Sequence, residues 1–465
     1  MNIRSRSAPA SLHPSARPFS SMACRGPTNR RNDAPFARNQ RQAGSGRITM
    51  SHGISRRGLV IGSATALGTM SLGRHVFAQD SGPIRIGLLA PLTGFAPDLG
   101  RDVKIGAEIA VEQLNKAGGV MGRPIELIVR DDKINPNETV AAMRELSGLG
   151  VKLFTGGIFT ATALAAFGIL QSIDGLFMTL HANGDSLTHE NFNPLGFRLN
   201  ENAAIRGRAA GRLAAQKYPE IRHWSGITTD NEAGASQWRA FAAGIRRYYP
   251  EIAGKEPVIT DVIKVKVGAN DFKNEIAQIM AGPVEGLMLS FPDPATLVQQ
   301  ARPFGWERKI KVFMDMGNDV VLANALGKRT PPNFWTASDW YSGAYVDRVP
   351  AAKRLYDDYV ARTGDDRPSG YVGVSHAAID VYVQAIAKAG ASSTKAVAKV
   401  LEENTFDTVG GKRSFRSDHQ ATGDSNFYNF VASDTDRRGW SVAQFVAEDN
   451  SSVAPQPTPG VRLAE

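Results

Sequence analysis

The side chains that could do chemistry lack the spacing that enzymes require. Asp131 and Asp132 could suggest a catalytic carboxylate pair or Ca²⁺ ligands, but adjacent side chains after a strand diverge, which favours a turn. Ser375 stands in Gly-Val-Ser-His-Ala, which lacks the second glycine of a nucleophile elbow. Residues 327–329 read Gly-Lys-Arg, without the Ser or Thr of a phosphate-binding loop.

Other signatures of catalysis or of bound groups are also missing. No G-x-G-x-x-G follows a strand, no H-E-x-x-H occurs, and the eight histidines are scattered, with His181 and His189 the nearest two. The one cysteine, Cys24, lies in the N-terminal leader, which excludes disulfides and thiolate metal sites in the rest of the chain. We therefore expect a protein that is not an enzyme and has no cofactor or metal.

Apolar runs and helical patterns alternate through most of the chain. Short β-branched runs bounded by Gly, Pro or Asp predict buried strands at 83–91, 124–132, 151–157, 175–182, 222–230, 257–268, 284–291 and 309–317. Apolar residues at helical spacing predict helices at 98–119, 135–150, from about Thr160, at 233–249 and at 271–281. Such alternation is typical of α/β folds whose parallel sheets carry helices on both faces.

The length of the body indicates more than one sheet. About 387 residues follow position 78, too many for one doubly wound sheet, so we expect two doubly wound lobes. Three helices at about 348–362, 369–389 and 393–403 have no strands between them and must pack on one of the lobes. The proline-rich segment 453–460 predicts a loose tail.

An export signal is suggested at residues 50–78. Arg56 and Arg57 precede sixteen uncharged residues, 58–73, a run too short to span a bilayer. Val76-Phe77-Ala78 places small residues where a signal peptidase would cleave, near Ala78, and 55–60 resembles the twin-arginine export motif. We expect a periplasmic protein, although a retained anchor and export by general secretion both stay open.

Residues 1–49 precede the position where such a signal should begin. They are rich in Arg, Ser, Pro and Asn without an apolar periodicity, so they read as a disordered extension or as a mis-assigned start before Met50. Residues 1–78 carry twelve arginines and one acid, a charge of +11, while the whole chain is +9, so the remainder sums to −2. The near-neutral body removes the main reason to expect nucleic-acid binding.

Three stretches of the body are similar to a known family. They are "RIGLLAPLTG", "GAEIAVEQLNKAGGVMGRPIELIVRDDKINPNETVAAMREL" and "DTVGGKRSFRSDHQATGDSNFYNFV". They resemble the branched-chain amino-acid (leucine, isoleucine, valine) binding proteins of ABC importers, over about 83–445. The resemblance implies a type I periplasmic-binding fold with a ligand cleft between two lobes and a three-strand hinge. Lobe one would comprise about 83–203 and 345–424, and lobe two about 204–344 and 425–450.

The resemblance also implies ligand-binding residues in lobe one. Thr160, followed by Ala161 and Thr162, stands where a hydroxyl residue at a helix start binds the ligand carboxylate. Thr160 could equally cap its helix. In the loop after the next strand, His181 and Asn183 stand where the family binds the α-amino group, or they serve as a structural histidine and a turn residue.

The family pattern is less complete around the rest of the cleft. Leu99 stands near a common aromatic position, and Ala233 near a position that is usually tyrosine. Asp315 is the nearest carboxylate to the acid that pairs with the ligand ammonium, so either Asp315 accepts the ammonium or the ligand has none. Phe291, Trp340 and Tyr341 either line an apolar pocket or pack in the core.

We therefore expect a monomeric periplasmic solute-binding protein. It would deliver a branched-chain amino acid, or a related carboxylate or amide, to an inner-membrane ABC permease. The alternative is an exported sensor of the same fold that signals to a receptor or regulator. An exported hydrolase would require a nucleophile arrangement that the sequence lacks.

Overall fold

The computed structural model describes residues 82–463, which belong to one compact unit. The predicted extension 1–49, the signal peptide 50–78 and its cleavage near Ala78 lie outside the described residues. None of the helices between residues 82 and 463 combines the length and apolar character needed to cross a membrane.

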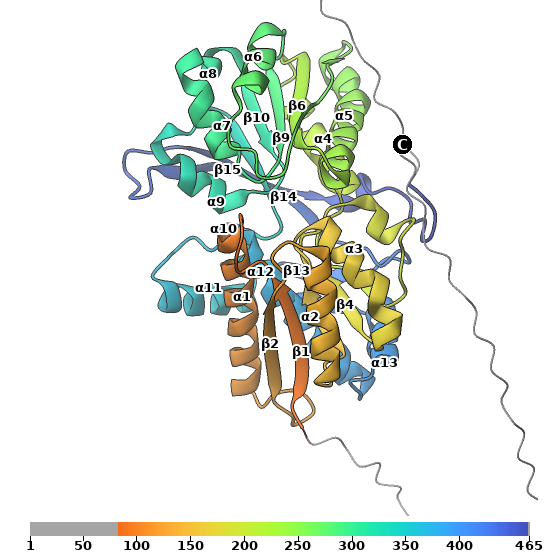
Figure 1. Cartoon of the computed structure of the whole chain (residues 1–465). Coiled ribbons are helices and arrows are strands. Elements are labelled where there is room, and N and C mark those ends of the chain that lie inside the picture. Colours follow the sequence, from red (N-terminus) through yellow and green to blue (C-terminus); the bar gives the residue numbers. More distant parts are fainter. Residues whose placement is uncertain (1–81, 464–465) are drawn as a thin grey trace, which may run out of the picture. The chain divides into compact units, whose positions relative to one another are not determined.

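Lobe one is built on a five-stranded parallel sheet in the order β2-β1-β3-β4-β5 (Figure 1). Its strands are β1 (Ile84–Ala90), β2 (Ile125–Asp131), β3 (Leu153–Gly156), β4 (Leu176–Thr179) and β5 (Gly196–Arg198). The continuous apolar run of β1 matches its position between two neighbours, with both faces buried. The sheet separates two apolar cores. The helices that cover it are α1 (Pro97–Lys116), α11 (Pro350–Thr363), α12 (Gly370–Ala389) and α13 (Thr394–Glu403) on one face, and α2 (Pro136–Gly148) and α3 (Thr160–Ile169) on the other.

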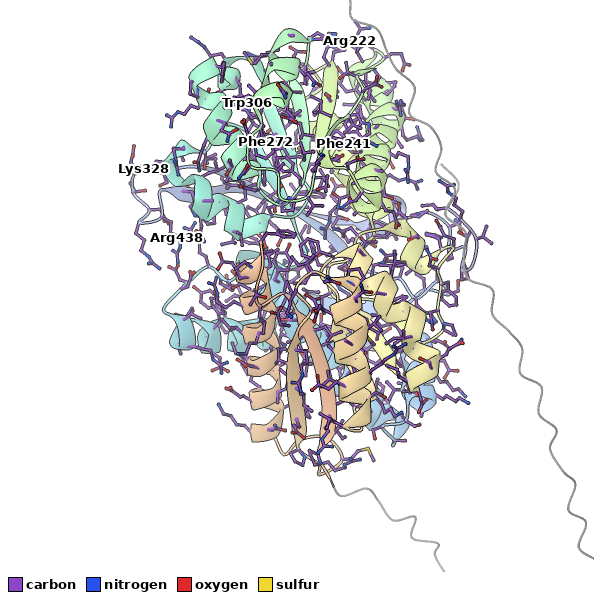
Figure 2. The ribbon with its side chains drawn as sticks, in the orientation of Figure 1. Arg222, Phe241, Phe272, Trp306, Lys328 and Arg438 are labelled. Carbon is purple, nitrogen blue, oxygen red and sulfur yellow. The ribbon has the colours of Figure 1, made fainter. Side chains whose placement is uncertain are left out.

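Lobe two contains the second large sheet, in the order β15-β14-β11-β10-β9-β6-β7, with β8 also paired to β6. The strands are β6 (His223–Thr229), β7 (Val258–Ile259), β8 (Ile263–Val265), β9 (Gly286–Ser290), β10 (Val312–Asp315), β11 (Phe334–Ser338), β14 (Asp424–Ala432) and β15 (Trp440–Asp449). Helices α4 (Ala203–Lys217) and α5 (Glu232–Ala253) cover one face, and α6 (Lys273–Ala281), α7 (Pro294–Ala301) and α9 (Asp319–Leu326) the other. Figure 2 shows Phe241, Phe272 and Trp306 inside this lobe, where all three are fully buried.

Two features of this sheet differ from the sequence prediction. The strand predicted at 257–268 is two short strands, because β7 pairs with the start of β6 and β8 with its end. Strands β14 and β15 form an antiparallel hairpin on the edge next to β11, so the sheet is mixed rather than wholly parallel. The predicted fold class, two α/β lobes, is confirmed.

Three chain segments connect the lobes. They lie between β5 and α4, between β11 and the short helix α10 (Ser342–Tyr345), and before β14. The last follows a small hairpin of β12 (Thr405–Thr408) and β13 (Gly411–Ser414). Because helices α11 to α13 follow the second crossing, they pack in the core of lobe one together with residues of β1.

The C-terminal tail is attached to both lobes rather than loose. Val453 is buried in the core of lobe two, and its carbonyl accepts from the Arg208 guanidinium of α4 (3.4 Å). The Gly460 N–H then donates to the His189 carbonyl of lobe one (2.7 Å), and the Thr458 hydroxyl contacts His189 Nδ1 (2.8 Å). The tail therefore links lobe two to lobe one outside the three crossings.

Ending the chain at Ala454 is expected to lower the free energy of unfolding by about 1–3 kcal/mol. The two hydrogen bonds to His189 are lost, each with a net value of about 0.5–1.5 kcal/mol. Urea unfolding measures the difference. The variant Thr458→Val should show about half of it, since only the hydroxyl contact is removed. Equal stability of the truncated and full chains would contradict the tie between the lobes.

Candidate ligand-binding site

A cavity of about 360 Å³ lies between the two lobes. Its walls come from the segments that follow β1, β2, β3 and β4 in lobe one, and from those that follow β6, β8, β9 and β10 in lobe two. These strands end at the cavity, which is where open parallel sheets place their ligands. Tyr371, at the start of α12, closes it with a hydroxyl that donates to the Gly317 carbonyl of lobe two (3.1 Å).

A glycine pair after β3 brings the start of α3 to the cavity. Gly156 and Gly157 have positive φ angles of 122° and 64°, and a Cβ on Gly156 would lie 1.9 Å from the Leu89 carbonyl oxygen. Helix α3 then begins at Thr160 without a side-chain cap, so its first N–H groups have no side-chain acceptor. The Thr160 hydroxyl accepts from the Gly184 N–H (3.0 Å), which leaves its own proton available to a ligand.

The loop after β4 contributes a histidine and an amide. His181 lines the cavity, and its Nδ1 contacts the Asp339 carboxylate on the other side of the ring. The Asn183 Oδ1 accepts from Asn200 Nδ2 (2.9 Å), and the Asn183 carbonyl accepts from the Ala203 N–H (2.8 Å). Both oxygens of Asn183 are therefore used to hold the first crossing in place.

Seven of the nine residues predicted from the sequence line this cavity. They are Leu99, Thr160, Ala161, His181, Asn183, Ala233 and Phe291. They come from five separate loops or helix starts and from both lobes. The structure thus brings these seven predicted residues, from both lobes, together around one cavity.

The other two predicted residues, Thr162 and Asp315, do not line it. The Thr162 hydroxyl donates to the Phe159 carbonyl within its own helix (2.9 Å), so it stabilises the first turn of α3. The buried Asp315 carboxylate accepts from the Gly317 and Asn318 N–H groups, from Asn318 Nδ2 and from the Thr336 hydroxyl. Burial raises the Asp315 pKa despite these bonds. Asp315 shapes the loop after β10 and does not line the cavity.

Several lining residues were missed. Phe95 stands four residues before Leu99 and is 45% exposed in the cavity wall, so the aromatic at the first loop is present at a different position. Phe159 packs edge-on against it, with ring centroids 5.7 Å apart. Gln237 and Ser290 also line the cavity, and they contact each other across lobe two. The sequence signals available for these two aromatics were that Phe159 adjoins Thr160 and that Phe95 stands in the loop before Leu99, where an aromatic was expected.

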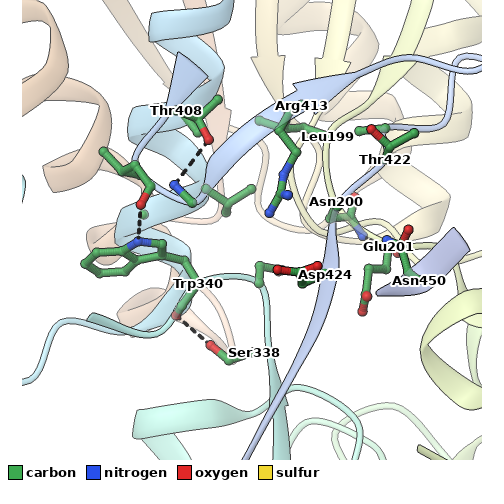
Figure 3. Close-up of a pocket in the computed structure, with 18 residues that line it drawn as sticks. Leu199, Asn200, Glu201, Ser338, Trp340, Thr408, Arg413, Thr422, Asp424 and Asn450 are labelled. Carbon is green, nitrogen blue, oxygen red and sulfur yellow. Dashed lines mark hydrogen bonds between the residues drawn. The ribbon is translucent and has the colours of Figure 1, made fainter. Parts of the chain in front are cut away.

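Trp340 and Tyr341 pack away from this cavity. The Trp340 indole is buried and donates to the Val409 carbonyl (2.9 Å), while Tyr341 stacks on Tyr428 with centroids 5.0 Å apart. Figure 3 shows Trp340 beside a second, much smaller cavity of about 30 Å³ at the three crossings. That volume has room for about two waters and excludes a ligand of amino-acid size.

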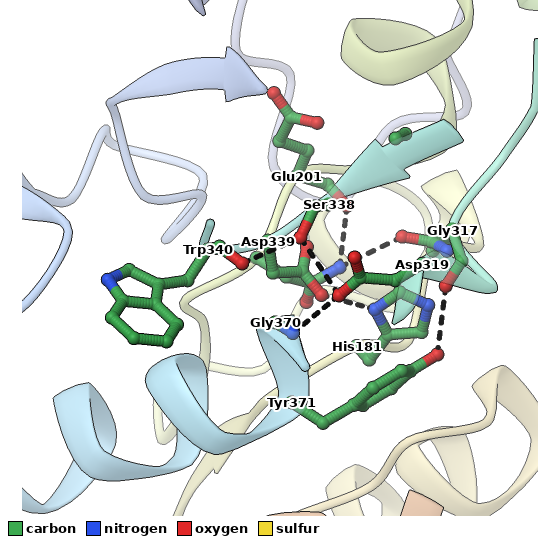
Figure 4. A network of polar contacts seen from close by, with 12 residues as sticks. His181, Glu201, Gly317, Asp319, Ser338, Asp339, Trp340, Gly370 and Tyr371 are labelled. Atoms are coloured by element: carbon green, nitrogen blue, oxygen red, sulfur yellow. Dashed lines mark hydrogen bonds and ion pairs between the residues drawn. The ribbon is translucent and has the colours of Figure 1, made fainter. Parts of the chain in front are cut away.

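A buried ionic cluster joins the cavity to the crossings (Figure 4). We name the side chains of His181, Glu201, Arg206, Asp339 and Ser425 the hinge cluster. The Arg206 guanidinium is fully buried and contacts the Asp339 carboxylate, Glu201 Oε2 (3.1 Å) and the Met316 carbonyl (3.2 Å). The Ser425 hydroxyl contacts the other Glu201 oxygen. Glu201 and Asp339 lie in the first two crossings and Ser425 lies at the start of β14, directly after the third, so the cluster fixes the three segments relative to one another.

The cluster sets the protonation of its carboxyl groups. Burial opposes ionisation of Asp339, but the charge of Arg206 and the contact with His181 outweigh it and lower the Asp339 pKa to about 2. Burial dominates at Glu201 and raises its pKa. Between residues 82 and 463, no three His, Cys, Asp or Glu side chains are grouped as a metal site would require.

Comparison with known proteins identifies relatives of the whole two-lobed unit. The sequence model of the periplasmic binding protein family matches residues 83–436. The leucine-, isoleucine-, valine-, threonine- and alanine-binding protein of Pseudomonas aeruginosa is 26% identical over 342 residues, which cover 73% of this chain and 87% of that protein.

Solved structures show the same fold. The closed conformation of a leucine-, isoleucine-, valine-, threonine- and alanine-binding protein from Brucella ovis has a TM-score of 0.69, with 19% identity over 82% of this chain and 98% of that one. An ABC-transporter solute-binding protein from R. palustris, in complex with benzoate, has a TM-score of 0.67, with 16% identity over 82% of this chain and all of that one.

Proposed function

Because this chain belongs to the periplasmic binding protein family, we propose that its cavity binds a small solute for delivery to an ABC permease. The resemblance to leucine-, isoleucine- and valine-binding proteins is confirmed, as is the prediction that the chain is a binding protein and not an enzyme. The observation that carries the proposal is the cavity between the lobes, which residues of both lobes line.

The ligand that we propose is a branched-chain amino acid or a related small carboxylate. The named specificity of the Pseudomonas aeruginosa relative supports the amino acid, and the benzoate complex from R. palustris supports a carboxylate without an amine. The uncapped start of α3 and the Thr160 hydroxyl would hold the carboxylate, since helix N-termini attract anions. The seven predicted residues that line the cavity are the ligand contacts that we propose.

Closure of the lobes would follow ligand binding. A ligand that contacts both lobes stabilises the closed arrangement by its differential affinity for that state. Delivery to a permease, rather than sensing, is supported by the ABC-transporter solute-binding proteins among the solved structures of the same fold. For the leader, we propose that residues 50–78 act as a cleaved export signal and that the protein works in the periplasm.

A thermal-shift panel on residues 79–465 tests the proposed function. The panel would contain branched-chain amino acids, aromatic and aliphatic carboxylates, dicarboxylates and amides. A ligand present at a hundred times its Kd adds about 2.7 kcal/mol of stability. If no member of the panel raises the unfolding temperature, the proposed function is wrong.

Replacing Thr160 with valine is expected to weaken ligand binding about tenfold to a hundredfold. A hydrogen bond to a charged group is worth about 1.5–3 kcal/mol, and valine keeps the shape of threonine without its hydroxyl. Isothermal titration with the best ligand of the panel measures the change.

Two matched variants control this measurement. Thr160→Ser retains the hydroxyl and should retain most of the affinity. Thr162→Val removes a hydroxyl two residues away, on the same helix, that donates to Phe159 and not to the cavity. An equal loss of affinity in the two valine variants would remove Thr160 from the proposed contacts.

A further inference from the structure

A set of charged side chains joins the two lobes outside the ligand cavity. The turn between β14 and β15, residues 433–439 of lobe two, meets the loop between α11 and α12, residues 364–369 of lobe one. Arg438 lies at the level where the lobes meet (Figure 2). We name the charged side chains that pair here the lobe latch: Asp365, Asp366 and Arg367 from lobe one, and Asp436 and Arg438 from lobe two.

Arg438 pairs with two acids of the opposite lobe. Its guanidinium contacts the Asp365 carboxylate and, at 2.5 Å, Asp366 Oδ1. Only 12% of the Arg438 side chain is exposed, so water competes less for this cation than for the cation of an isolated surface pair. Hydrogen bonds between ionised partners are also stronger than those between neutral groups. The two contacts of Arg438 therefore resist separation of the lobes more than a single surface ion pair would.

Arg367 reaches in the opposite direction, from lobe one to lobe two. Its guanidinium contacts the Asp436 carboxylate and donates to the Trp440 carbonyl (3.1 Å). The same guanidinium lies 4.2 Å from the centroid of the Trp440 ring, which is a cation–π contact with a buried indole. Each lobe thus supplies both an arginine and a carboxylate to the latch.

The lobe-two half of the latch is fixed to its own lobe. The Trp440 indole donates to Asn324 Oδ1 of α9 (2.9 Å), which holds the start of β15. Within the turn, Asp436 Oδ1 accepts from the Arg438 N–H (2.8 Å), and the Gly439 N–H donates to the Asp436 carbonyl (2.9 Å). Because of these bonds, we expect the turn to move together with lobe two.

The lobe-one half of the latch is fixed to lobe one. The Arg367 N–H donates to Asp365 Oδ1 (2.9 Å), and the Asp365 N–H donates to the Thr363 hydroxyl at the end of α11 (3.1 Å). The buried Ser369 hydroxyl donates to Asp102 Oδ2 of α1 (2.7 Å). Since each half is tied to its own lobe, a rotation that separates the lobes at this point must break the latch.

The latch is distinct from the hinge. Strand β14 has nine residues, so the turn lies about 30 Å along the strand from the third crossing. A hollow of about 290 Å³ is bordered both by Arg367 and Trp440 and by Tyr341 of the second crossing. The lobes are therefore not packed continuously from that crossing to the latch, and the ion pairs themselves make the contact.

We infer that the lobe latch holds the two lobes together in the ligand-free protein and opens when the lobes separate. None of its five side chains lines the cavity, so a solute does not have to touch the latch. A ligand that contacts both lobes has an apparent affinity proportional to the fraction of molecules that are closed, and the latch raises this fraction before the ligand arrives. That consequence for affinity rests on the proposed function, whereas the latch itself does not.

Distances between spin labels in the two lobes test the inference. The labels attach to cysteines at two exposed positions, Asn137→Cys on α2 and Asn274→Cys on α6, in the full chain with Cys24→Ser so that no other cysteine reacts. Dialysis first removes any bound solute, and the wild-type latch should then give a main population at a short distance. Arg438→Gln should lower the ratio of the short-distance to the long-distance population at least about fivefold, the upper value for one exposed ion pair, because two pairs are lost.

Two further variants make the measurement specific to the latch. Arg437→Gln changes the neighbouring arginine, whose side chain is 65% exposed and reaches only Asp366 (3.4 Å), and it should leave the distances unchanged. Asp366→Lys places a lysine opposite Arg438 and should separate the lobes further than Arg438→Gln does. The Asp366 side chain is 52% exposed and pairs only with lobe two, so this variant leaves the fold of lobe one intact.

Three outcomes would overturn the inference. They are unchanged distances in Arg438→Gln, a wild type found mainly at the long distance, and a shift in Arg437→Gln equal to that in Arg438→Gln. The last of these would assign the effect to surface charge in general rather than to the buried cation of the latch. The measurement uses no solute, so each of these outcomes leaves the proposed function standing.

Discussion

Replacing Arg206 with methionine is expected to lower the free energy of unfolding by about 3–5 kcal/mol. Arg206 is fully buried, and its removal leaves the Glu201 carboxylate without a cation and Asp339 with His181 alone. Breaking a buried ion pair from one side costs this much because an uncompensated charge stays in a low-dielectric interior. Urea unfolding at pH 7 measures the loss.

An exposed arginine of lobe two provides the control. Arg247 pairs with Glu251 one turn away on α5, and both side chains are more than half exposed. Arg247→Met should cost less than about 1 kcal/mol, the usual limit for a surface pair. Equal losses in the two variants would show that the hinge cluster contributes no more than a surface ion pair.

The pH dependence of the Arg206→Met loss separates charge from packing. The folded-state pKa of Asp339 is depressed to about 2 from an ordinary value of 3.8. A depressed carboxyl pKa stabilises the fold above pH 4, and that contribution disappears as the pH falls toward 2. The difference in the free energy of unfolding between the wild type and Arg206→Met should therefore shrink as the pH falls from 4 toward 2. A constant difference would assign the effect to lost packing.

Local pattern was sufficient to predict most elements of the α/β core. The apolar run of β1 and the helical spacing of α1 are strong local signals, because each element buries a continuous surface. Strand β11 was not predicted, since Thr336 and Ser338 interrupt its apolar character. Their hydroxyls bond to Asp315 and Asp319, partners about twenty residues away that no local window contains.

The sequence predicted where the site residues stand along the chain better than it predicted which atoms their side chains contact. The resemblance placed Thr160, His181 and Asn183 at strand ends, and parallel strands bring those ends together. It could not show which way a side chain points. Thr162 turns into its own helix and Asp315 folds back on its own loop, and both directions depend on hydrogen bonds formed only in the folded chain.

The difference at Asp315 has a consequence for ligand recognition. Three carboxylates near the cavity, those of Asp315, Asp319 and Asp339, stabilise the loop after β10, the start of α9 and the hinge cluster, respectively. If one of them turned to a ligand, its present buried donors would lose their acceptor, at a cost that a single ammonium contact does not recover. These acidic neighbours of the cavity therefore serve the architecture.

A substitution of Asp319 is expected to have the second large effect on stability, because its carboxylate joins the two lobes. It begins α9 in lobe two, and its carboxylate contacts the Gly370 N–H at the start of α12 in lobe one. Burial dominates its surroundings and raises its pKa to about 7, against the hydrogen bonds from Tyr428, Gly370 and Ser338. Between about pH 4 and pH 7, the Asp319 carboxyl of the folded protein thus retains a proton that the unfolded chain has already released.

Replacing Asp319 with asparagine is expected to remove a stability loss of a few kcal/mol that the wild type shows between about pH 4 and pH 7. A carboxyl whose folded-state pKa is raised from 3.8 to about 7 stabilises the fold fully below pH 4, and this contribution is lost as the pH rises through 7. Asparagine suits the position because the φ angle of Asp319 is 55°, a left-handed conformation that Asn tolerates.

Urea unfolding of the wild type and of Asp319→Asn, at steps from pH 4 to pH 7, measures the free energy of unfolding of both proteins. The exposed control Asp271→Asn should leave the wild-type profile unchanged over pH 5–7. If Asp319→Asn also follows the wild-type profile in parallel, the Asp319 carboxyl does not titrate in this range.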